Sequence, residues 1–322
     1  MRAIVVNETT RELRIGEVPT PQPGTGEVLV KVAAAGVNRA DLLQRRGLYP
    51  PPPGVTDIIG MEVSGTVEAV GEGVDGHAPG DTVCALIAGG GYAEYAVVPA
   101  GQLLPVPDGL DTVDAAALPE VACMVWSNLV MEAGLGGGET VLIHGGGSGI
   151  GTHAIQVAKA LGATVAVTVG SEAKAQRCRE LGADIVINYH EQDFAEVLAG
   201  RVDVILDIIG AKYLQRNVSA LAVGGRLVII GMQGGVAGEL NIGMLIGKRC
   251  RVIGTNVRNR PLTGPGSKAA VVAQVQEHVW PMIAEGTVRP VISARLPLAD
   301  AEEGQALLDS ADSVGKVLLL PA

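Results

Sequence analysis

The sequence contains little cysteine, and its cysteines form no recognisable pair. The 322 residues include four of them, far apart in the chain and without a C-x-x-C pair. A disulfide framework or a structural zinc site needs cysteines at close, regular spacings. We therefore expect four reduced and mostly buried thiols: Cys84, Cys123, Cys178 and Cys250.

Several catalytic and targeting motifs are also missing. The chain has no H-E-x-x-H, no G-x-S-x-G and no P-loop, so hydrolase and kinase chemistry have no support. The N-terminal stretch "MRAIVVNETTRELRIG" lacks the continuous apolar segment of a secretory signal. No later run is expected to reach the length that spans a bilayer. We expect a cytoplasmic protein.

Positive charge is in deficit. The formal net charge is -10 and the sequence pI is about 5.0. Nucleic acids and anionic lipids are bound mainly through cations, so we expect neither a nucleic-acid nor a membrane partner. Hydrophobic residues make up 48% of the chain and charged residues 18%, which is typical of a globular protein and not of a disordered one.

Two hydrophobic patterns divide the chain. In residues 1–118, short β-type runs such as "EVLVKVAAAGV" alternate with Pro and Gly clusters, which predicts a mostly antiparallel β unit. In residues 119–263, apolar strands alternate with amphipathic helices, which predicts βαβ units and a parallel sheet. Residues 264–322 hold two helical stretches and a last strand, "GKVLLLP", which we expect to return to the first unit. The predicted fold class is α/β.

A glycine cluster lies between a predicted strand and a predicted helix, in "VLIHGGGSGIGTHAIQVAKALGA". Glycines let the backbone approach a pyrophosphate, and the helix N-terminus supplies N–H groups and a positive dipole. The G-x-G-x-x-G register fits except that its middle position is a serine. We interpret the cluster as a dinucleotide site; the alternative is a tight turn that binds nothing. The predicted contacts are Gly146, Gly147, Ser148, Gly149, Ile150 and Gly151.

The end of the next strand decides which dinucleotide binds. An acid there would hold the ribose 2′-hydroxyl of NAD and repel a 2′-phosphate. The chain instead offers Ser171, Lys174 and, after the adjacent strand, Tyr189. A hydroxyl, an ammonium and a phenol suit a phosphate, so we predict NADPH. In the alternative interpretation, Glu172 is the ribose acid and Lys174 is a solvated helix charge.

Three stretches carry a resemblance to a known family. "GMEVSGTVEAVG" ahead of a dinucleotide-binding unit resembles the medium-chain dehydrogenase/reductase superfamily. "GVNRADLLQRRGLYPPPPG" and "GTNVRNR" resemble its quinone oxidoreductase branch, in particular the tumour-suppressor-inducible and zeta-crystallin types. The resemblance spans nearly the whole chain. It implies a GroES-like β domain built from both chain ends, a Rossmann domain between them, a cleft where substrate meets nicotinamide, and homodimers joined through the Rossmann sheets at "RCRVIGT".

Zinc is not expected. Zinc-dependent members of the superfamily hold a catalytic metal with two cysteines and a histidine, which suit this borderline-soft ion. The matching positions here are Asn38, Met61 and Glu120. An amide, a thioether and one carboxylate do not make that site.

Without a Lewis acid, the best acceptor is one that already spreads charge, such as a quinone or an activated enone. Neutral hydrogen-bond donors then suffice to stabilise the reduced oxygen. The predicted donors are Asn38 and Tyr49, in the segment that by resemblance faces the nicotinamide. Asp41 orients Asn38 or forms an i,i+4 ion pair with Arg45. Pro50–Pro53 form an extended lip that fixes Tyr49.

Further cofactor contacts follow from position and resemblance together. After the strand "RLVII", one loop borders the cofactor, and an arginine in "GTNVRNR" closes over cofactor or substrate. Met124 lies where relatives contact the nicotinamide, and a core methionine is the alternative. These predicted contacts are Gly231, Met232, Gln233, Arg258 and Met124.

Three functions remain open at this point. The leading one is metal-free transfer of hydride or electrons from NADPH to a quinone or similar conjugated carbonyl. The second is reduction of an enone, alkenal or enoyl-thioester double bond. The third, from another class, is an NADPH-binding structural or RNA-associated protein. The sequence leaves open the physiological acceptor, and whether one electron or two are transferred.

Overall fold

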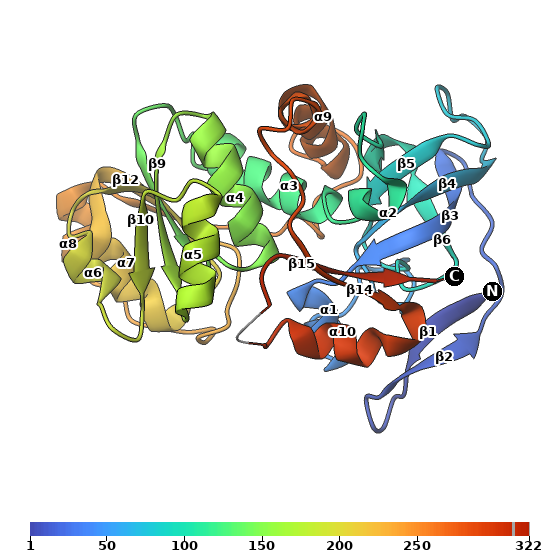
Figure 1. Cartoon of the computed structure of the whole chain (residues 1–322), viewed down its shortest axis with the longest axis horizontal. Helices are drawn as coiled ribbons and strands as arrows, with labels where there is room; N and C mark the ends of the chain where they lie inside the picture. The colour runs from blue at the N-terminus through green and yellow to red at the C-terminus, as the bar shows by residue number, and fades with distance from the viewer. Residues whose placement is uncertain (311–312, 322) are drawn as a thin grey trace. The chain divides into compact units, whose positions relative to one another are not determined.

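The computed structural model describes residues 1–310 and 313–321, and the chain divides into two compact units (Figure 1). Unit 1 comprises Met1–Cys123, Arg258–Gly286 and Pro290–Ala322, and unit 2 comprises Met124–Val257 and Thr287–Arg289. Unit 1 thus contains both chain ends, where Arg2 Nη2 donates to the carbonyl of Pro321 at 3.0 Å.

Unit 2 is built on a six-stranded parallel sheet (Figure 1). Its strands are β8 (Thr140–His144), β9 (Thr164–Val169), β10 (Ile185–Asn188), β11 (Val202–Asp207), β12 (Leu221–Ile229) and β13 (Arg251–Gly254). They pair in the order β10-β9-β8-β11-β12-β13, the doubly wound arrangement of a Rossmann domain. The order reverses between β8 and β11, and ligands of such sheets bind beyond the carboxyl ends of the strands at that point.

Helices cover both faces of this sheet because its central strands are apolar on both sides. In β8, Val141, Leu142 and Ile143 are all 0% exposed. Helices α4 and α5 pack against β8, β9 and β10, while α7 and α8 contact β12 (Figure 1). The helical segments of unit 2 are η2 (Trp126–Glu132), α4 (Gly149–Ala160), α5 (Glu172–Glu180), α6 (Phe194–Val197), η3 (Ala211–Tyr213), α7 (Leu214–Ala220) and α8 (Ile242–Lys248).

Unit 1 contains a seven-stranded sheet and a separate two-stranded one. The strands are β1 (Arg2–Val6), β2 (Leu13–Glu17), β3 (Glu27–Gly36), β4 (Glu62–Val70), β5 (Thr82–Leu86), β6 (Tyr95–Pro99), β7 (Leu103–Pro105), β14 (Ile292–Pro297) and β15 (Lys316–Leu320). The larger sheet runs β14-β15-β3-β4-β5-β7, with β6 also paired to β3. Strand β15 lies antiparallel to β3, with Leu318 opposite Gly36, which confirms that the last strand returns to the first unit.

Unit 1 also contains helices, several of which contact these strands. They are α1 (Arg39–Arg45), η1 (Ala100–Gln102), α2 (Thr112–Ala115), α3 (Pro119–Val125, whose last two residues belong to unit 2), α9 (Lys268–Ala284), η4 (Leu298–Asp300) and α10 (Ala301–Leu307). Trp280 of α9 donates its indole N–H to the carbonyl of Pro105 at 2.7 Å. The core between the strands includes the fully buried Ile4, Ile59 and Tyr92.

One helical stretch contradicts the prediction that no apolar run is long enough to span a membrane. Thr112–Glu132 is 21 residues long and apolar enough, by length and composition, to cross a bilayer, so the expectation that no run reaches that length was wrong. Its most apolar window is 72% buried inside the structure. That burial is typical of the core helix of a globular protein.

Candidate active site

Asn38 lies between β3 and α1, and its side-chain amide is held on both sides. It is the N-cap residue of α1, with extended backbone. The ammonium of Lys316 donates to its Oδ1 at 2.6 Å. Its Nδ2 donates to Glu62 Oε1 at 2.9 Å and lies 3.4 Å from the carbonyl of Gly36. The amide is therefore fixed in orientation, and both of its hydrogens already face protein acceptors.

Glu62 and Lys316 form a buried ion pair that the sequence did not suggest. The Nζ–Oε1 distance is 2.5 Å, with side-chain exposures of 0% for Glu62 and 5% for Lys316. Burial lowers the pKa of Lys316, but the surrounding carboxylates, Glu62 first, outweigh burial and raise it above the ordinary lysine value. A methyl group on Gly36 would overlap the Glu62 carboxylate. Glycine at this point of β3 thus lets a β4 side chain reach a β15 side chain across the strand between them.

Asp41 does not form the predicted ion pair with Arg45. It is 0% exposed, and its Oδ2 accepts the backbone N–H of Asn38 at 2.8 Å and the hydroxyl of Tyr92 at 2.9 Å. Arg45 instead pairs with Glu302. The i,i+4 prediction was wrong because Asp41 lies on the buried face of α1. Burial raises the pKa of Asp41 to about 6, although both donors lower it.

Glu120, at the start of α3, joins the same cluster. Its backbone N–H donates to Glu62 Oε2 at 2.9 Å. Its carboxyl Oε2 is buried and has no hydrogen-bond partner in the described chain. Burial, together with the negative charges of Glu62 and Asp41, raises its pKa to about 7, although Lys316 lowers it.

Arg258 holds Tyr49, the residue before the predicted lip. Residues 50–53 form no helix or strand. Arg258, only 6% exposed, donates from Nη1 to the carbonyl of Tyr49 at 3.3 Å, and its guanidinium carbon lies 5.0 Å from the Tyr49 ring centroid. It also donates to the carbonyl of Ala88 at 2.7 Å and to Gln44 Oε1 at 2.6 Å. Arg258 thus binds Tyr49 to other residues of unit 1. The predicted contact of Arg258 with cofactor or substrate stays a prediction.

In unit 2, the glycine cluster forms a strand–turn–helix at the end of β8. Ser148 is the N-cap residue of α4: its Oγ accepts the N–H of Gly151 at 3.0 Å and donates to the carbonyl of Gly145 at 2.7 Å. The serine that breaks the glycine motif therefore closes the turn. A methyl group on Gly151 would overlap the Gly145 carbonyl oxygen and lie 2.7 Å from that of Gly146. The first N–H groups of α4 remain at the helix end, where they suit an anion.

The three residues predicted to hold a 2′-phosphate gather around the end of β9. Ser171 is the N-cap residue of α5 and accepts the N–H of Lys174 at 3.4 Å. The Lys174 stem lies against Gly147, where an added Cβ would be 3.0 Å from its Cδ. A methyl group on Gly170 would overlap the Tyr189 hydroxyl. The Lys174 side chain thus borders the glycine turn after β8, and the Tyr189 phenol borders the turn after β9.

Glu172, the rival ribose ligand, is engaged elsewhere. Its carboxylate pairs with Arg179 at 2.7 Å along α5 and is 76% exposed. A solvated helix pair of this kind is typical of a surface residue. Glu172 is thus engaged on the surface of α5, and the role of Lys174 in selecting the cofactor stays a prediction.

A buried polar network that the sequence did not suggest supports the turn. His144 contacts Thr168 Oγ1 at 3.0 Å and Asn217 Oδ1 at 2.8 Å. Asn217 in turn donates to Asp207 at 3.0 Å. Asp207 also accepts the N–H groups of Ile209 and Gly210, which follow β11. Burial lowers the pKa of His144 to about 4, so it packs as a neutral side chain. The sequence signal for this network was that polar residues, His144 and Asp207, end the apolar strands β8 and β11.

The remaining predicted contacts lie in unit 2. The backbone N–H of Gln233 donates to Ile208 O at 3.3 Å. The loop it belongs to therefore lies beside the end of β11, and its Met232 is 58% exposed. Met124 is half-buried, and its carbonyl accepts Asn128 Nδ2 at 2.7 Å. Their cofactor contacts stay predictions.

The positions that match zinc ligands do not offer a zinc site. Asn38 Oδ1 already accepts from an ammonium, and that charge would repel a divalent cation. Met61 contributes a thioether, and Glu120 one carboxylate. Among the described residues, no group of three or more His, Cys, Asp or Glu side chains could hold a metal ion. The donor set does not fit catalytic zinc.

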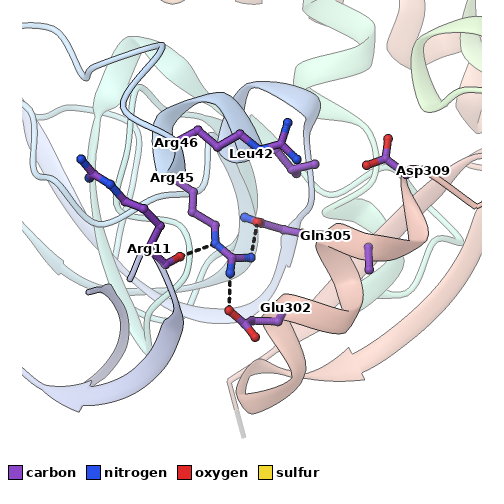
Figure 2. Close-up of a pocket in the computed structure, with 8 residues that line it drawn as sticks. Arg11, Leu42, Arg45, Arg46, Glu302, Gln305 and Asp309 are labelled. Atoms are coloured by element: carbon purple, nitrogen blue, oxygen red, sulfur yellow. Dashed lines mark hydrogen bonds and ion pairs between the residues drawn. The ribbon is translucent and has the colours of Figure 1, made fainter. Parts of the chain in front are cut away.

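A pocket of about 370 Å³ lies beside α1 and α10 (Figure 2). Figure 2 shows Arg45 at its centre, bonded to the carbonyl of Arg11, to Gln305 Oε1 and to Glu302. None of the predicted site residues lines it. The lining residues are Arg11, Leu42, Arg45, Arg46, Glu302, Gln305, Ala306 and Asp309. Its polar groups are largely paired with each other, so we place the reaction elsewhere.

Comparison with known proteins gives consistent matches along the chain. Residues 24–108 match the alcohol dehydrogenase GroES-like domain, and residues 149–273 match the zinc-binding dehydrogenase family. Rat quinone oxidoreductase is 32% identical, with 94% of this chain and 92% of that protein covered. Acryloyl-coenzyme A reductase of Sulfurisphaera tokodaii is 30% identical, with 100% of both covered. The solved structure of Escherichia coli quinone oxidoreductase complexed with NADPH is 29% identical, with a TM-score of 0.88 and 99% of both chains covered.

Proposed function

Because the chain belongs to the medium-chain dehydrogenase/reductase superfamily, we propose that it is an NADPH-dependent quinone oxidoreductase that reduces a quinone or similar conjugated carbonyl without a metal. The observation that carries this proposal is the Asn38 cluster, which consists of Asn38, Asp41, Glu62, Glu120 and Lys316. Where zinc-dependent relatives have thiolate and imidazole, this chain has an amide bound by a lysine ammonium. An acceptor that needs no Lewis acid suits such a site.

Cofactor binding is assigned to unit 2. The α4 N-terminus and Ser148 would hold the pyrophosphate, with Ser171, Lys174 and Tyr189 around the 2′-phosphate. When bound, NADPH supplies the hydride. NADPH in the solved E. coli quinone oxidoreductase supports the choice.

The substrate-facing role is assigned to Tyr49. Its ring is held by Arg258, so its phenol is presented at a fixed place on the lip. The amide hydrogens of Asn38 face Glu62 and Gly36, so we give Asn38 a positioning role and Tyr49 the hydrogen bond to the acceptor oxygen.

The test is NADPH oxidation with a panel of ortho- and para-quinones, with and without a metal chelator. We expect chelator-insensitive turnover. In Tyr49→Phe, kcat/KM should fall about tenfold, the effect of removing one neutral hydrogen bond. Tyr95→Phe, the same change on β6, should leave it unchanged. Turnover that requires a tightly bound transition metal would contradict the proposal.

The second candidate function is reduction of an enoyl thioester or alkenal. It is favoured by the full-length match to acryloyl-coenzyme A reductase. The same assay with acryloyl-coenzyme A and conjugated alkenals separates the two: fast alkene reduction with no quinone turnover would select it. Cofactor binding without any turnover, together with salt-sensitive RNA binding, would instead favour a structural or RNA-associated protein.

Cofactor preference rests on Lys174. Replacing it by alanine should raise KM for NADPH about tenfold, because one charge-assisted hydrogen bond to the 2′-phosphate is lost. KM for NADH, which has no such phosphate, should not change. Lys212→Ala, in η3, is the control. A wild-type preference for NADH that survives in Lys174→Ala would overturn the assignment.

We also propose a homodimer formed through β13. This strand is the edge of the parallel sheet, and an edge strand offers unpaired backbone groups to a second copy. Apolar side chains are exposed on it and on α8, with Val252 at 37% and Ile246 at 70%. Sedimentation velocity should show two chains for the wild type and one for Val252→Lys.

A cytoplasmic location remains our proposal. The four cysteines are free, which suits a compartment that keeps thiols reduced. Cell fractionation with an antibody to the chain would test it.

A further inference from the structure

The buried cluster of unit 1 contains more acids than bases. Three carboxyl groups meet there, from α1 (Asp41), β4 (Glu62) and the start of α3 (Glu120), linked through the amide of Asn38 and the backbone of Glu120. The one lysine among them, Lys316, pairs with Glu62 at 2.5 Å. With Glu62 neutralised in this way, two further carboxylates would remain as unpaired negative charges in a buried place, which costs several kcal/mol per ion.

Two carboxyl oxygens of the cluster have no hydrogen-bond partner in the described chain. They are Asp41 Oδ1 and Glu120 Oε2, both buried. The two groups differ in their other contacts. Asp41 Oδ2 accepts two hydrogen bonds, which favour its ionised form. Among the described residues no donor reaches Glu120 Oε2, so a proton on Glu120 relieves the buried charge at the least cost.

We propose that Glu120 is protonated in the resting protein and that its proton is the one consumed when the acceptor is reduced. The inference rests on the proposed function. A quinone that accepts a hydride from bound NADPH would become a hydroquinone monoanion, with NADP⁺ as the oxidised product. The O–H bond of Glu120 then breaks, its proton forms the new O–H bond on the anionic oxygen, and the Glu120 carboxylate regains a proton from water.

The surroundings of Glu120 set it to exchange a proton near neutral pH. Burial, together with the negative charges of Glu62 and Asp41 and against the opposing charge of Lys316, raises its pKa to about 7. On its own helix, Cys123 also faces it, and burial raises the pKa of that thiol well above its ordinary value, so the thiol stays neutral. The pKa of Asp41 is raised only to about 6, so Asp41 gives up its proton first as pH rises.

The proton can be observed without any turnover. Infrared spectroscopy of the full chain should show the carbonyl stretch of a protonated carboxylic acid at pH 7, where Asp41 and Asp207, whose pKa values are raised only to about 6, are mostly ionised, and the band should disappear as pH rises further. Glu120→Gln should lose this band, while Glu68→Gln, an exposed acid on β4, should keep it. In Asp41→Asn the band should titrate at lower pH, because one neighbouring negative charge is gone. Circular dichroism checks that each variant is folded.

Kinetics then decide whether the proton is used. In the wild type, kcat with a quinone should fall as pH rises through about 7, and in Glu120→Gln this dependence should be absent, with Glu120→Asp restoring it. An absent band alongside normal quinone turnover would overturn the inference and leave the proposed function standing. A band with identical pH profiles in wild type and Glu120→Gln would overturn proton delivery. No reduction of any acceptor would overturn the proposed function, and proton delivery with it.

Discussion

Replacing Lys316 by methionine should lower the free energy of unfolding of unit 1 by about 3–5 kcal/mol. The side chain keeps most of its length, but Glu62, at 0% exposure, loses the ammonium that pairs with it. Asn38 Oδ1 loses its donor as well. The effect comes from the uncompensated carboxylate, since a well-made buried pair contributes little in itself.

The pH at which the free energy of unfolding should be measured follows from the pKa of Lys316. The folded pKa of Lys316 is raised above that of an unfolded lysine. Its contribution is therefore fully present below the unfolded value, about 10.4, and is lost only as pH rises through the folded value. Urea unfolding at pH 7 measures the whole effect. The reporter is Trp280, which is buried in unit 1, in a Trp126→Phe background.

Two controls separate burial from charge. Arg295→Met breaks an exposed pair with Asp114 in the same unit, where the side chains are 46% and 26% exposed, and should cost about 1 kcal/mol or less. Adding Glu62→Gln to Lys316→Met should recover a large part of the loss, because the Glu62 carboxylate that lost its ammonium is then removed as well. If Lys316→Met and Arg295→Met lower the free energy of unfolding by the same amount, Glu62 and Lys316 do not form a buried ion pair in the folded protein.

The glycine turn was predictable from sequence because all of its determinants are local. A five-residue apolar strand, a glycine cluster and an amphipathic helix follow one another in the chain, and Ser148 lies where a helix N-cap belongs. The return of the last strand to the first unit was predictable in the same way, from a break in the strand–helix rhythm. Such patterns fix element type and order.

The Asn38 cluster was only partly predictable because its partners are brought together by the sheet. Asn38 and Lys316 are 278 positions apart in sequence. Strand periodicity gives the face on which a side chain lies but not which strand is its neighbour. Of the two roles predicted for Asp41, the pair with Arg45 was wrong for the same reason: its partner Tyr92 is 51 positions away, while Arg45 is one helical turn along the chain.

Replacing Gly151 by alanine should weaken NADPH binding about 100-fold, close to 2.7 kcal/mol. The added methyl would overlap the Gly145 carbonyl oxygen and lie 2.7 Å from the Gly146 carbonyl oxygen. Both are backbone atoms, so the turn itself must open. Opening it moves the N–H groups at the start of α4 and breaks the bond from Gly151 to Ser148 Oγ. Calorimetric titration of NADPH measures the loss.

Gly247→Ala is the matched control. Gly247 lies in α8 and nothing lies within 4 Å of an added Cβ, so NADPH affinity should not change, and the helix should gain up to about 1 kcal/mol. Unfolding of unit 2, followed by Trp126 in a Trp280→Phe background, shows whether Gly151→Ala is folded under the titration conditions.

The two cofactor variants together separate the pyrophosphate from the 2′-phosphate. Every dinucleotide carries the pyrophosphate, so Gly151→Ala should weaken NADPH and NADH by the same factor. Lys174→Ala should weaken NADPH alone, because only NADPH carries the phosphate that the ammonium would bind. A Gly151→Ala protein that is folded and binds NADPH as tightly as the wild type would mean that the cofactor does not lie on the α4 N-terminus, and the Lys174 assignment, which depends on the same turn, would fall with it.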